Sequence, residues 1–268
     1  MRLLLENVRV RAADGTAERT LLSVDRFTLA SGERLGLKGA SGSGKTTFLK
    51  AISGILRAEG SVLWDDTDLS RLSEAERDAW RGRNVGFLFQ DFRLFDGLNA
   101  LENVLLPVTF TRSITDADRR RGEELLERFG VRPQTEASRL SRGEMQRTAL
   151  VRVLLQSPAV ILADEPTASL DKLNARAVMA ALMETAEELR STLIVVTHDP
   201  EMLATLPRVG AIEEGRLKEA VFVKKDFQEF SKSSSRSPRS NAGRFHFRER
   251  QRAPYAFACA LGLSGFRN

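Results

Sequence analysis

Nine residues, Gly39 to Thr47, constrain the fold of this chain more than any other feature of its sequence. They read Gly-Ala-Ser-Gly-Ser-Gly-Lys-Thr-Thr and match the pattern Gly-x-x-x-x-Gly-Lys-Ser/Thr. Residues 35–37 before them are expected to form a strand, and residues 44–56 a helix with one apolar face. A glycine-rich loop between a strand and a helix directs several backbone N–H groups at one anion, so the sequence predicts a phosphate-binding site.

The residue types inside this loop suit the β- and γ-phosphates of a nucleotide. Glycines let the backbone curl, Lys45 can place its ammonium between the two phosphates, and the Thr46 hydroxyl can bind Mg²⁺. The alternative is a Gly/Ser-rich loop without a ligand, and the flanking strand and helix favour the phosphate site. The residues expected at the phosphates are Gly39, Ala40, Ser41, Gly42, Ser43, Gly44, Lys45, Thr46 and Thr47.

Two carboxylates follow the apolar run at residues 159–163, which is typical of a strand buried on both faces. Open α/β sheets bind ligands at the carboxyl ends of such strands. Asp164 is therefore expected in the Mg²⁺ shell, and Glu165 is expected to orient and polarise a water for in-line attack on the γ-phosphorus. The alternative is a strand that simply ends in acidic surface residues.

A histidine follows the next expected buried strand, at residues 193–196. His198 is one of two histidines in the chain. A lone histidine is more often structural than catalytic. His198, however, ends a strand beside the expected phosphate site, and this position favours a functional role. His198 is therefore expected to face the γ-phosphate.

The segment Leu140–Arg147 leads into an expected helix at residues 143–156. Ser141 and Glu144 have the spacing of the N-cap and N3 residues of a capping box. A capped helix N-terminus that carries a serine hydroxyl is also an anion site. The structural and the binding interpretations of Ser141 are therefore compatible.

The order of the expected elements predicts the class of fold. Strands that alternate with helices indicate a mostly parallel sheet covered by helices, and short strands near the N-terminus add an antiparallel β portion. Residues 91–155 carry helical patterns without a strand signal of their own. We therefore expect an α/β fold, a P-loop NTPase core with an α-helical subdomain inserted at about residues 91–155.

Charge and cysteine content limit the compartment and the partners. The net charge is +5, but residues 231–268 hold eight Lys or Arg and one acid, which leaves −2 for the first 230 residues. The main body is therefore not expected to bind nucleic acid. Cys259 is the only cysteine, which suits a reducing compartment. No apolar run approaches the roughly 20 residues of a spanning helix, and the first residues are expected to form a strand rather than a signal peptide.

The composition changes after about residue 230. Residues 231–240 read Ser-Lys-Ser-Ser-Ser-Arg-Ser-Pro-Arg-Ser and have too little apolar content to fold. Residues 223–268 are therefore expected to form a basic, Ser/Arg-rich and largely disordered tail. Three roles stay open for it: contact with anionic lipid, binding of a partner, or no role if the tail is the product of a shifted reading frame.

Together these motifs, in this order, resemble the nucleotide-binding domain of ABC ATPases over about residues 1–222. The resemblance implies that Gln90 links Mg²⁺ or the attacking water to the helical subdomain, and that it acts in catalysis with Glu165 and His198. The residues that carry the resemblance are Gly39–Thr46, Gln90, Leu140–Arg147, Ala163–Glu165, Ser169–Asp171 and His198.

The same resemblance implies a dimeric machine. Ser141 and Gly143 would reach across the dimer to the nucleotide of the other subunit, and Asp171 would lie at the dimer seam. Two copies would sandwich two ATP molecules with Mg²⁺, close on ATP and open after hydrolysis. The implied protein is the ATP-binding and ATP-hydrolysing subunit of an ABC transporter. It would be peripheral to the cytoplasmic side of the inner membrane, with transmembrane permease subunits and a second copy of itself as partners.

Residues 100–104 and 163–171 look most like the group that contains lipoprotein-release, macrolide-export and cell-division ATPases. This likeness implies export, or extrusion of a lipoprotein or peptide. The alternative is a regulatory ATPase of the cell-division type, which signals through a membrane partner without moving a substrate.

Two places depart from the family pattern. Arg142 stands where the family usually has glycine, between Ser141 and Gly143, and activity is expected to survive it. Residues 10–15 read Val-Arg-Ala-Ala-Asp-Gly and lack the aromatic that usually stacks on adenine. Base stacking contributes about 1–3 kcal/mol in nucleic-acid binders, so we expect weaker nucleotide affinity and looser base selectivity.

Overall fold

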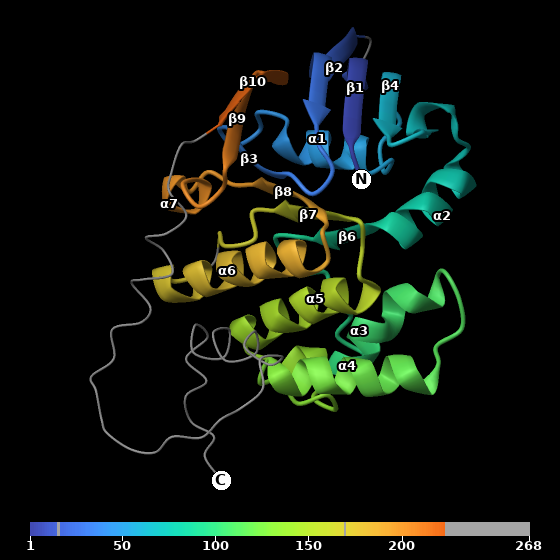
Figure 1. Ribbon diagram of the computed structural model, residues 1–268, viewed down its shortest axis with the longest axis vertical. Coiled ribbons are helices and arrows are strands. Elements are labelled where there is room, and N and C mark those ends of the chain that lie inside the picture. The colour runs from blue at the N-terminus through green and yellow to red at the C-terminus, as the bar shows by residue number, and fades with distance from the viewer. Residues whose placement is uncertain (15–16, 169, 223–268) are drawn as a thin grey trace, which may run out of the picture.

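Ten strands form one sheet in the computed structural model, which describes residues 1–14, 17–168 and 170–222 (Figure 1). The order across the sheet is β5-β4-β1-β2-β10-β9-β3-β8-β7-β6. The tail predicted at residues 223–268 lies outside the described residues. The strands are β1 (Leu3–Asp14), β2 (Ala17–Leu29), β3 (Arg34–Lys38), β4 (Glu59–Trp64), β5 (Thr67–Asp68), β6 (Val85–Leu88), β7 (Val160–Asp164), β8 (Thr192–Val196), β9 (Arg208–Glu213) and β10 (Arg216–Phe222).

The half of the sheet that carries the predicted site is parallel and consists of β9, β3, β8, β7 and β6. Every residue of β7 and β8 is buried, because helices cover both faces of these strands. Successive residues point to opposite faces. Val160 and Leu162 pack in one cluster with residues of α1, whereas Ile161 and Ala163 pack in another with residues of α5 and α6. The expected buried strands at 159–163 and 193–196 are confirmed.

The other half of the sheet is the antiparallel portion expected near the N-terminus. β1 pairs antiparallel with both β2 and β4, and β4 pairs antiparallel with β5. β10, from later in the chain, pairs antiparallel with β9 and joins β2 through one parallel pair, Arg216 with Ser23. Leu3, Leu5, Val8 and Val10 are buried on one face of β1, and the residues between them are half-buried or exposed. This alternation is what a sheet with one covered face requires. The predicted fold class is therefore confirmed.

Helices cover the parallel strands from both sides. Figure 1 shows α1 on one side and α6 and α5 on the other, with α3 and α4 beyond α5. Residues 91–155 hold α3, α4 and α5 and contribute no strand to the sheet, as expected. The limits of this block as a subdomain stay a prediction. The helices are α1 (Lys45–Ile52), α2 (Glu74–Asn84), α3 (Ala100–Thr109), α4 (Asp116–Arg128), α5 (Arg142–Gln156), α6 (Lys172–Glu188) and α7 (Pro200–Leu203).

Helix α2 was not among the expected elements. It has almost no apolar stripe, since Arg77 and Trp80 are its buried residues. Residues close together in the sequence fix where the helix begins, because Ser73 and Glu76 form a capping box at its N-terminus. Tertiary packing fixes the position of α2 in the fold, because the centre of the Trp80 ring lies 6.3 Å from that of the Trp64 ring on β4.

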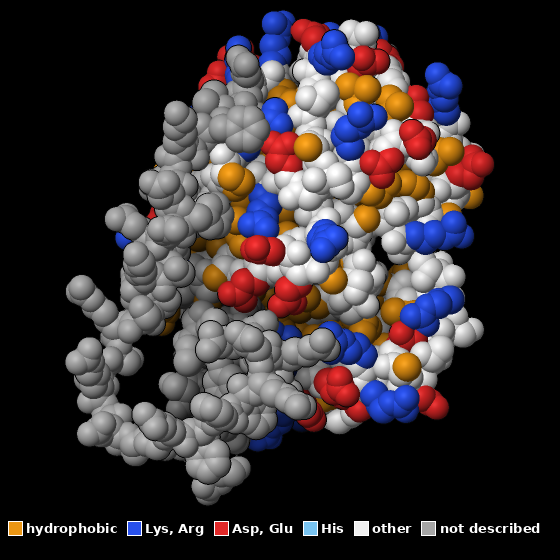
Figure 2. Space-filling model, in the orientation of Figure 1, with side chains coloured by type: hydrophobic (Ala, Val, Ile, Leu, Met, Phe, Trp, Pro, Cys, Tyr) orange, Lys and Arg blue, Asp and Glu red, His pale blue; other side chains and the backbone are white. Residues whose placement is uncertain are grey.

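The surface shown in Figure 2 mixes basic and acidic side chains, with small apolar areas between them. Such interspersed charges leave little long-range field of one sign. The composition of the first 230 residues, with a net charge of −2, has the same balance.

Candidate active site

The glycine-rich loop joins β3 to α1, as expected. Gly42 and Gly44 have φ of 74° and 105°, which side-chain-bearing residues rarely adopt. A Cβ on Gly39 would collide with the carbonyl oxygen of Ile212 and with the Ser43 hydroxyl. The fixed glycines of the motif are therefore required by the backbone path itself.

Two features of this loop suit an anion. Helix α1 begins at Lys45, and its N-cap Gly44 provides no side-chain cap, so the first N–H groups of the helix stay available to a ligand. The buried Ser43 hydroxyl has no hydrogen-bond partner within the described part of the chain. Lys45 is 8% exposed, and its ammonium donates to the carbonyl oxygens of Gly39 at 2.8 Å and Ala40 at 2.9 Å. The loop itself therefore holds the ammonium close to the backbone that would cradle phosphate.

Parallel strand ends bring the predicted catalytic residues to this loop. β8 lies between β3 and β7, and Asp164 at the end of β7 pairs in register with Val196 at the end of β8. The carboxylate of Glu165, the next residue, lies 3.8 Å from the Lys45 ammonium and 3.0 Å from Nδ1 of His198. The residues that the structure gathers are therefore those that the sequence pattern predicted at the γ-phosphate.

Glu165 is held in an unusual backbone conformation. Its φ is 47°, a region that costs a non-glycine residue on the order of 1–3 kcal/mol. Its backbone N–H donates to the carbonyl oxygen of Val196 at 2.8 Å, which fixes the turn. The side chain of Glu165 is 11% exposed, whereas that of His198 is 67% exposed. A mostly covered carboxylate beside a solvent-facing imidazole can accept a proton from water and pass it outward.

The residues expected to hold Mg²⁺ have suitable chemistry. Burial raises the pKa of Asp164, and a hydrogen bond from the Thr46 side chain opposes that rise. Asp164 and Thr46 therefore already share a contact. Mg²⁺ is usually held by one or two carboxylates together with substrate phosphates and water. Among the described residues, no group of three or more His, Cys, Asp or Glu side chains is arranged to hold a metal ion by itself.

Gln90 lies at the same edge of the sheet. It is exposed and follows β6, whose last residue, Leu88, pairs with Ala163 beside Asp164. Gln90 is thus near the carboxyl end of a strand adjacent to β7. Its contact with an ion or water stays a prediction.

Ser141, Gly143 and Asp171 are not part of this cluster. No hydrogen bond or ion pair between described residues joins them to Lys45 or Glu165. Ser141 is the exposed N-cap of α5, and it forms the expected capping box with Glu144 at 2.6 Å between Oγ and Oε2. That hydrogen bond lowers the pKa of Glu144.

Asp171 is the exposed N-cap of α6. It accepts hydrogen bonds from the backbone N–H groups of Leu173 and Asn174, both at 3.0 Å. Backbone and side-chain hydrogen bonds from Asn174 lower its pKa. Both α5 and α6 therefore begin with a capped, accessible turn, and the roles predicted for Ser141 and Asp171 in a dimer stay predictions.

Sequence reasoning missed two buried polar residues on α5. The Gln146 side chain donates to the carbonyl oxygen of Pro166 at 2.7 Å, directly after Glu165. Arg152 donates to the carbonyl oxygens of Phe92 and Arg93, shortly after Gln90. The available signal was a polar or charged side chain on the apolar face of a helix.

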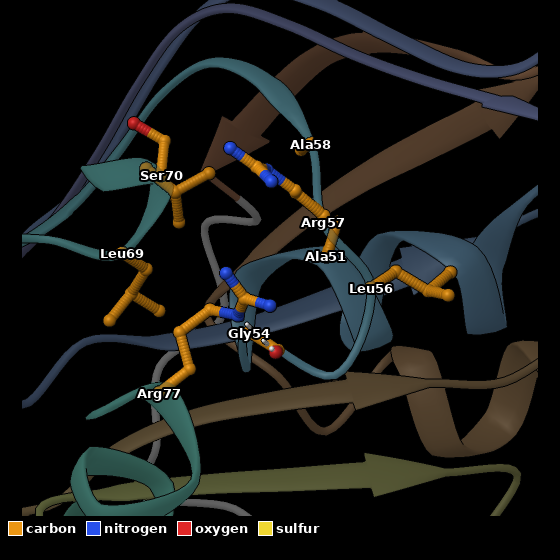
Figure 3. Close-up of a pocket in the computed structure, with 9 residues that line it drawn as sticks. Ala51, Gly54, Leu56, Arg57, Ala58, Leu69, Ser70 and Arg77 are labelled. Carbon is orange, nitrogen blue, oxygen red and sulfur yellow. Dashed lines mark hydrogen bonds between the residues drawn. The ribbon is translucent and has the colours of Figure 1, made fainter. Parts of the chain in front are cut away.

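A small hollow lies elsewhere in the described part of the chain. It has a volume of about 10 Å³ and is lined by residues around Gly54, after the C-terminal end of α1, including Arg77 (Figure 3). A cavity of this size holds at most one water. It is therefore not the phosphate site, which surrounds the opposite end of α1.

A glycine-rich phosphate loop, with two carboxylates at the end of a nearby parallel strand, defines a nucleotide-hydrolysing P-loop NTPase. The sequence profile of one family, described as ABC transporter, matches residues 22–168. The chain therefore belongs to the ABC transporter family. It is the ATP-binding, ATP-hydrolysing subunit of such a transporter, as expected from the resemblance.

Three known proteins illustrate the similarity. The lipoprotein-releasing system ATP-binding protein LolD of Pseudomonas syringae pv. tomato is 37% identical over 210 residues, which covers 77% of this chain and 92% of that protein. The dimeric, post-hydrolysis structure of the ATP-binding cassette MJ0796 with ADP and Pi is 31% identical. It has a TM-score of 0.77 and covers 84% of this chain and 100% of its own.

The third is cbiO1 of Clostridium perfringens, part of the ABC transporter complex cbiONQ. It is 28% identical with a TM-score of 0.69, over 81% of this chain and 87% of its own. No helix in the described ranges is both long and apolar enough to cross a bilayer.

Proposed function

We propose that this chain drives a transporter that extrudes a lipoprotein or peptide, by hydrolysing ATP in a dimer beneath its membrane partner. The observation that carries the ATPase mechanism is the contact between Glu165, His198 and the phosphate-loop lysine at one edge of the sheet. The named function of the LolD relative supports the lipoprotein part. The same relative does not favour the regulatory alternative of the cell-division type.

Each residue of the cluster has a proposed task. Lys45 and the backbone N–H groups of the loop bind the β- and γ-phosphates. Glu165 accepts the proton of the attacking water, and His198 holds the Glu165 carboxylate in place and faces the γ-phosphate from the solvent side. Thr46, Asp164 and Gln90 would hold Mg²⁺. When bound, Mg²⁺ would neutralise negative charge on the phosphate oxygens.

The second copy completes the site in this proposal. Ser141 is exposed and Gly143 is half-buried at the start of α5, and Asp171 is exposed at the start of α6. Among the described residues, no hydrogen bond or ion pair joins either start to Lys45 or Glu165 of the same chain. Helix N-termini attract phosphate, so these turns suit the nucleotide held by the partner copy.

The organisation of the chain supports a peripheral protein. We assign residues 1–222 to the ATP-binding domain, with residues 91–155 as its helical subdomain. Because the described residues include no spanning helix, contact with the membrane would run through the permease subunits. We place the protein on the cytoplasmic side of the inner membrane, where ATP is available.

Isolation of the natural partner tests this function. The full chain is purified from native membranes in mild detergent and its companion is identified. The complex is then reconstituted in vesicles that carry a lipoprotein. ATP-dependent release of the lipoprotein is expected, and a Glu165→Gln complex should not release it. ATP hydrolysis without release of any lipoprotein would overturn the substrate class.

A further inference from the structure

We propose that Arg152 is a positioning residue that clamps the loop carrying Gln90 onto helix α5, and thereby sets where the Gln90 side chain lies. The inference rests on the proposed role of Gln90 and deepens it, because it gives a task to a residue outside every motif of the site.

Arg152 is a buried cation without a carboxylate partner among the described residues. It is 8% exposed. Burial lowers the pKa of its guanidinium to about 10, so the group still carries its charge at neutral pH. A buried charge without an acidic partner is costly for the fold. The contacts that it does make therefore need an explanation.

Both of the hydrogen bonds of Arg152 go to one short turn of backbone. Its Nη1 donates to the carbonyl oxygen of Arg93 at 2.7 Å, and its Nη2 donates to that of Phe92 at 2.5 Å. These carbonyls lie two and three residues after Gln90. A planar guanidinium fork can hold two adjacent carbonyls at once, whereas the point charge of a lysine cannot fix both.

The turn needs such a clamp because its backbone is strained. Phe92 and Arg93 have φ of 57° and 49°, two successive side-chain-bearing residues in the left-handed region. The other contacts that hold the turn are local: Phe92 N–H donates to Phe89, and the Arg93 guanidinium pairs with Asp91 at 2.9 Å. Arg152 and the buried Phe92 ring connect the turn to a distant helix.

The helix that Arg152 belongs to also touches the catalytic end of β7. Gln146, on the same helix, donates to the carbonyl oxygen of Pro166, the residue after Glu165. Helix α5 thus holds the Gln90 loop through one side chain and the Glu165 loop through another. The pairing of β6 with β7 brings the two loops to the same edge of the sheet, and α5 adds a second link between them. Arg152 supplies the side of this second link that holds the Gln90 loop.

The test compares Arg152→Lys and Arg152→Met in the purified full chain. We expect amide hydrogen exchange at residues 89–95 to become about tenfold faster, because the clamp no longer opposes local opening. We expect kcat for ATP to fall about 10–100-fold, since small misplacement of a catalytic group has effects of this size. KM should change little, because the phosphate loop is untouched. The lysine variant keeps the charge, so it separates loss of the fork from loss of charge.

Arg77→Lys is the matched control. Arg77 is also a buried arginine, 9% exposed, and it donates to two backbone carbonyls, those of Gly54 at 3.2 Å and Leu72 at 2.9 Å (Figure 3). Arg77→Lys should lower the free energy of unfolding about as much as Arg152→Lys does. Exchange at residues 89–95 and kcat should stay at wild-type values.

A double-mutant cycle with Gln90→Ala separates this inference from the proposed function. If Arg152 acts through Gln90, then Arg152→Lys lowers kcat no further once Gln90 is removed. Additive losses, or unchanged exchange at residues 89–95 in both Arg152 variants, would overturn the inference. If Gln90→Ala alone leaves kcat unchanged, the proposed role of Gln90 fails, and the exchange result still decides whether Arg152 holds the loop.

Discussion

Glu165 and His198 are in direct contact at the ends of two adjacent parallel strands. Nδ1 of His198 lies 3.0 Å from both carboxylate oxygens of Glu165, and the backbone N–H of His198 donates to the same carboxylate at 3.4 Å. The histidine therefore restrains the carboxylate through two groups. A carboxylate held this way faces the phosphate loop in one orientation, which suits a base that must meet a positioned water.

The first prediction concerns Glu165. Glu165→Gln keeps the shape of the side chain but removes the proton acceptor, so kcat for ATP should fall by about 10²–10⁴-fold. The ATP-bound dimer should persist, which size-exclusion chromatography with ATP would detect. Glu201→Gln, which alters a partly exposed acid paired with Arg176, is the control and should keep wild-type turnover. Unimpaired hydrolysis by Glu165→Gln would remove Glu165 from its proposed role.

The second prediction concerns His198. His198→Ala should lower kcat while leaving the KM for ATP nearly unchanged, because the imidazole orients Glu165 rather than binding the loop. In a Glu165→Gln background, His198→Ala should lower kcat by a much smaller factor, because the carboxylate that His198 orients is already absent. Steady-state kinetics of the two single variants and the double variant measure this. Independent, additive effects would contradict the coupling.

The third prediction concerns nucleotide binding and Mg²⁺. A ligand that binds only the folded state at about 100 times its Kd stabilises it by about 2.7 kcal/mol. ATP with Mg²⁺ should therefore raise the Tm of the wild-type chain, and chelation of Mg²⁺ by EDTA should remove much of that rise. Lys45→Ala should lose the rise but keep the Tm measured without ATP. An equal rise in Lys45→Ala would show that ATP binds elsewhere.

The fourth prediction concerns base selectivity. Val10 is buried in the core, and Arg11 pairs with Glu59 at 3.5 Å, so these side chains are engaged elsewhere. Neither this pair nor the rest of segment 10–15 supplies an aromatic ring for stacking on adenine. ATP and GTP should therefore bind with Kd values within about threefold of each other. Calorimetry with both nucleotides checks this, and low-micromolar binding of ATP with far weaker binding of GTP would refute it.

The fifth prediction concerns stability and pH. The guanidinium of Arg112 donates to both oxygens of Asp118 at 2.6 and 2.7 Å, and the Thr115 backbone and hydroxyl donate as well. These hydrogen bonds hold the pKa of Asp118 far below its usual value. A lowered pKa contributes stability at neutral pH that is lost as pH falls through the folded-state pKa.

Asp118→Asn should therefore be about 1 kcal/mol less stable at pH 7. Below a pH of about 4 the carboxyl of Asp118 takes up its proton in the unfolded chain. The difference in unfolding free energy between the wild-type chain and Asp118→Asn should therefore become smaller there. Urea unfolding at several pH values measures it. Asp116→Asn, in the same first turn of α4, is the control and should show a smaller gap at pH 7. A gap that is independent of pH would contradict the ionic origin.

Local sequence specified several elements completely. The apolar runs at 159–163 and 193–196 became fully buried strands, because such runs are stable only with both faces covered. The capping box at Ser141 and Glu144 formed as expected, since its partners are three residues apart. Helix α2 escaped prediction because its place depends on Trp80 packing against Trp64, a contact between separate elements.

The sequence by itself determined the chemistry of the phosphate loop and the Ser141 helix cap, because these depend on neighbours a few residues apart. It also marked the two buried strands, because a continuous apolar run is stable only where other elements cover both of its faces. Tertiary structure alone decided that Glu165 meets His198, 33 residues away, and that Arg152 meets Phe92, 60 residues away. Strand order and helix packing set these distances, and no local pattern encodes them. The catalytic contact and the clamp on the Gln90 loop therefore exist only once the parallel sheet has assembled.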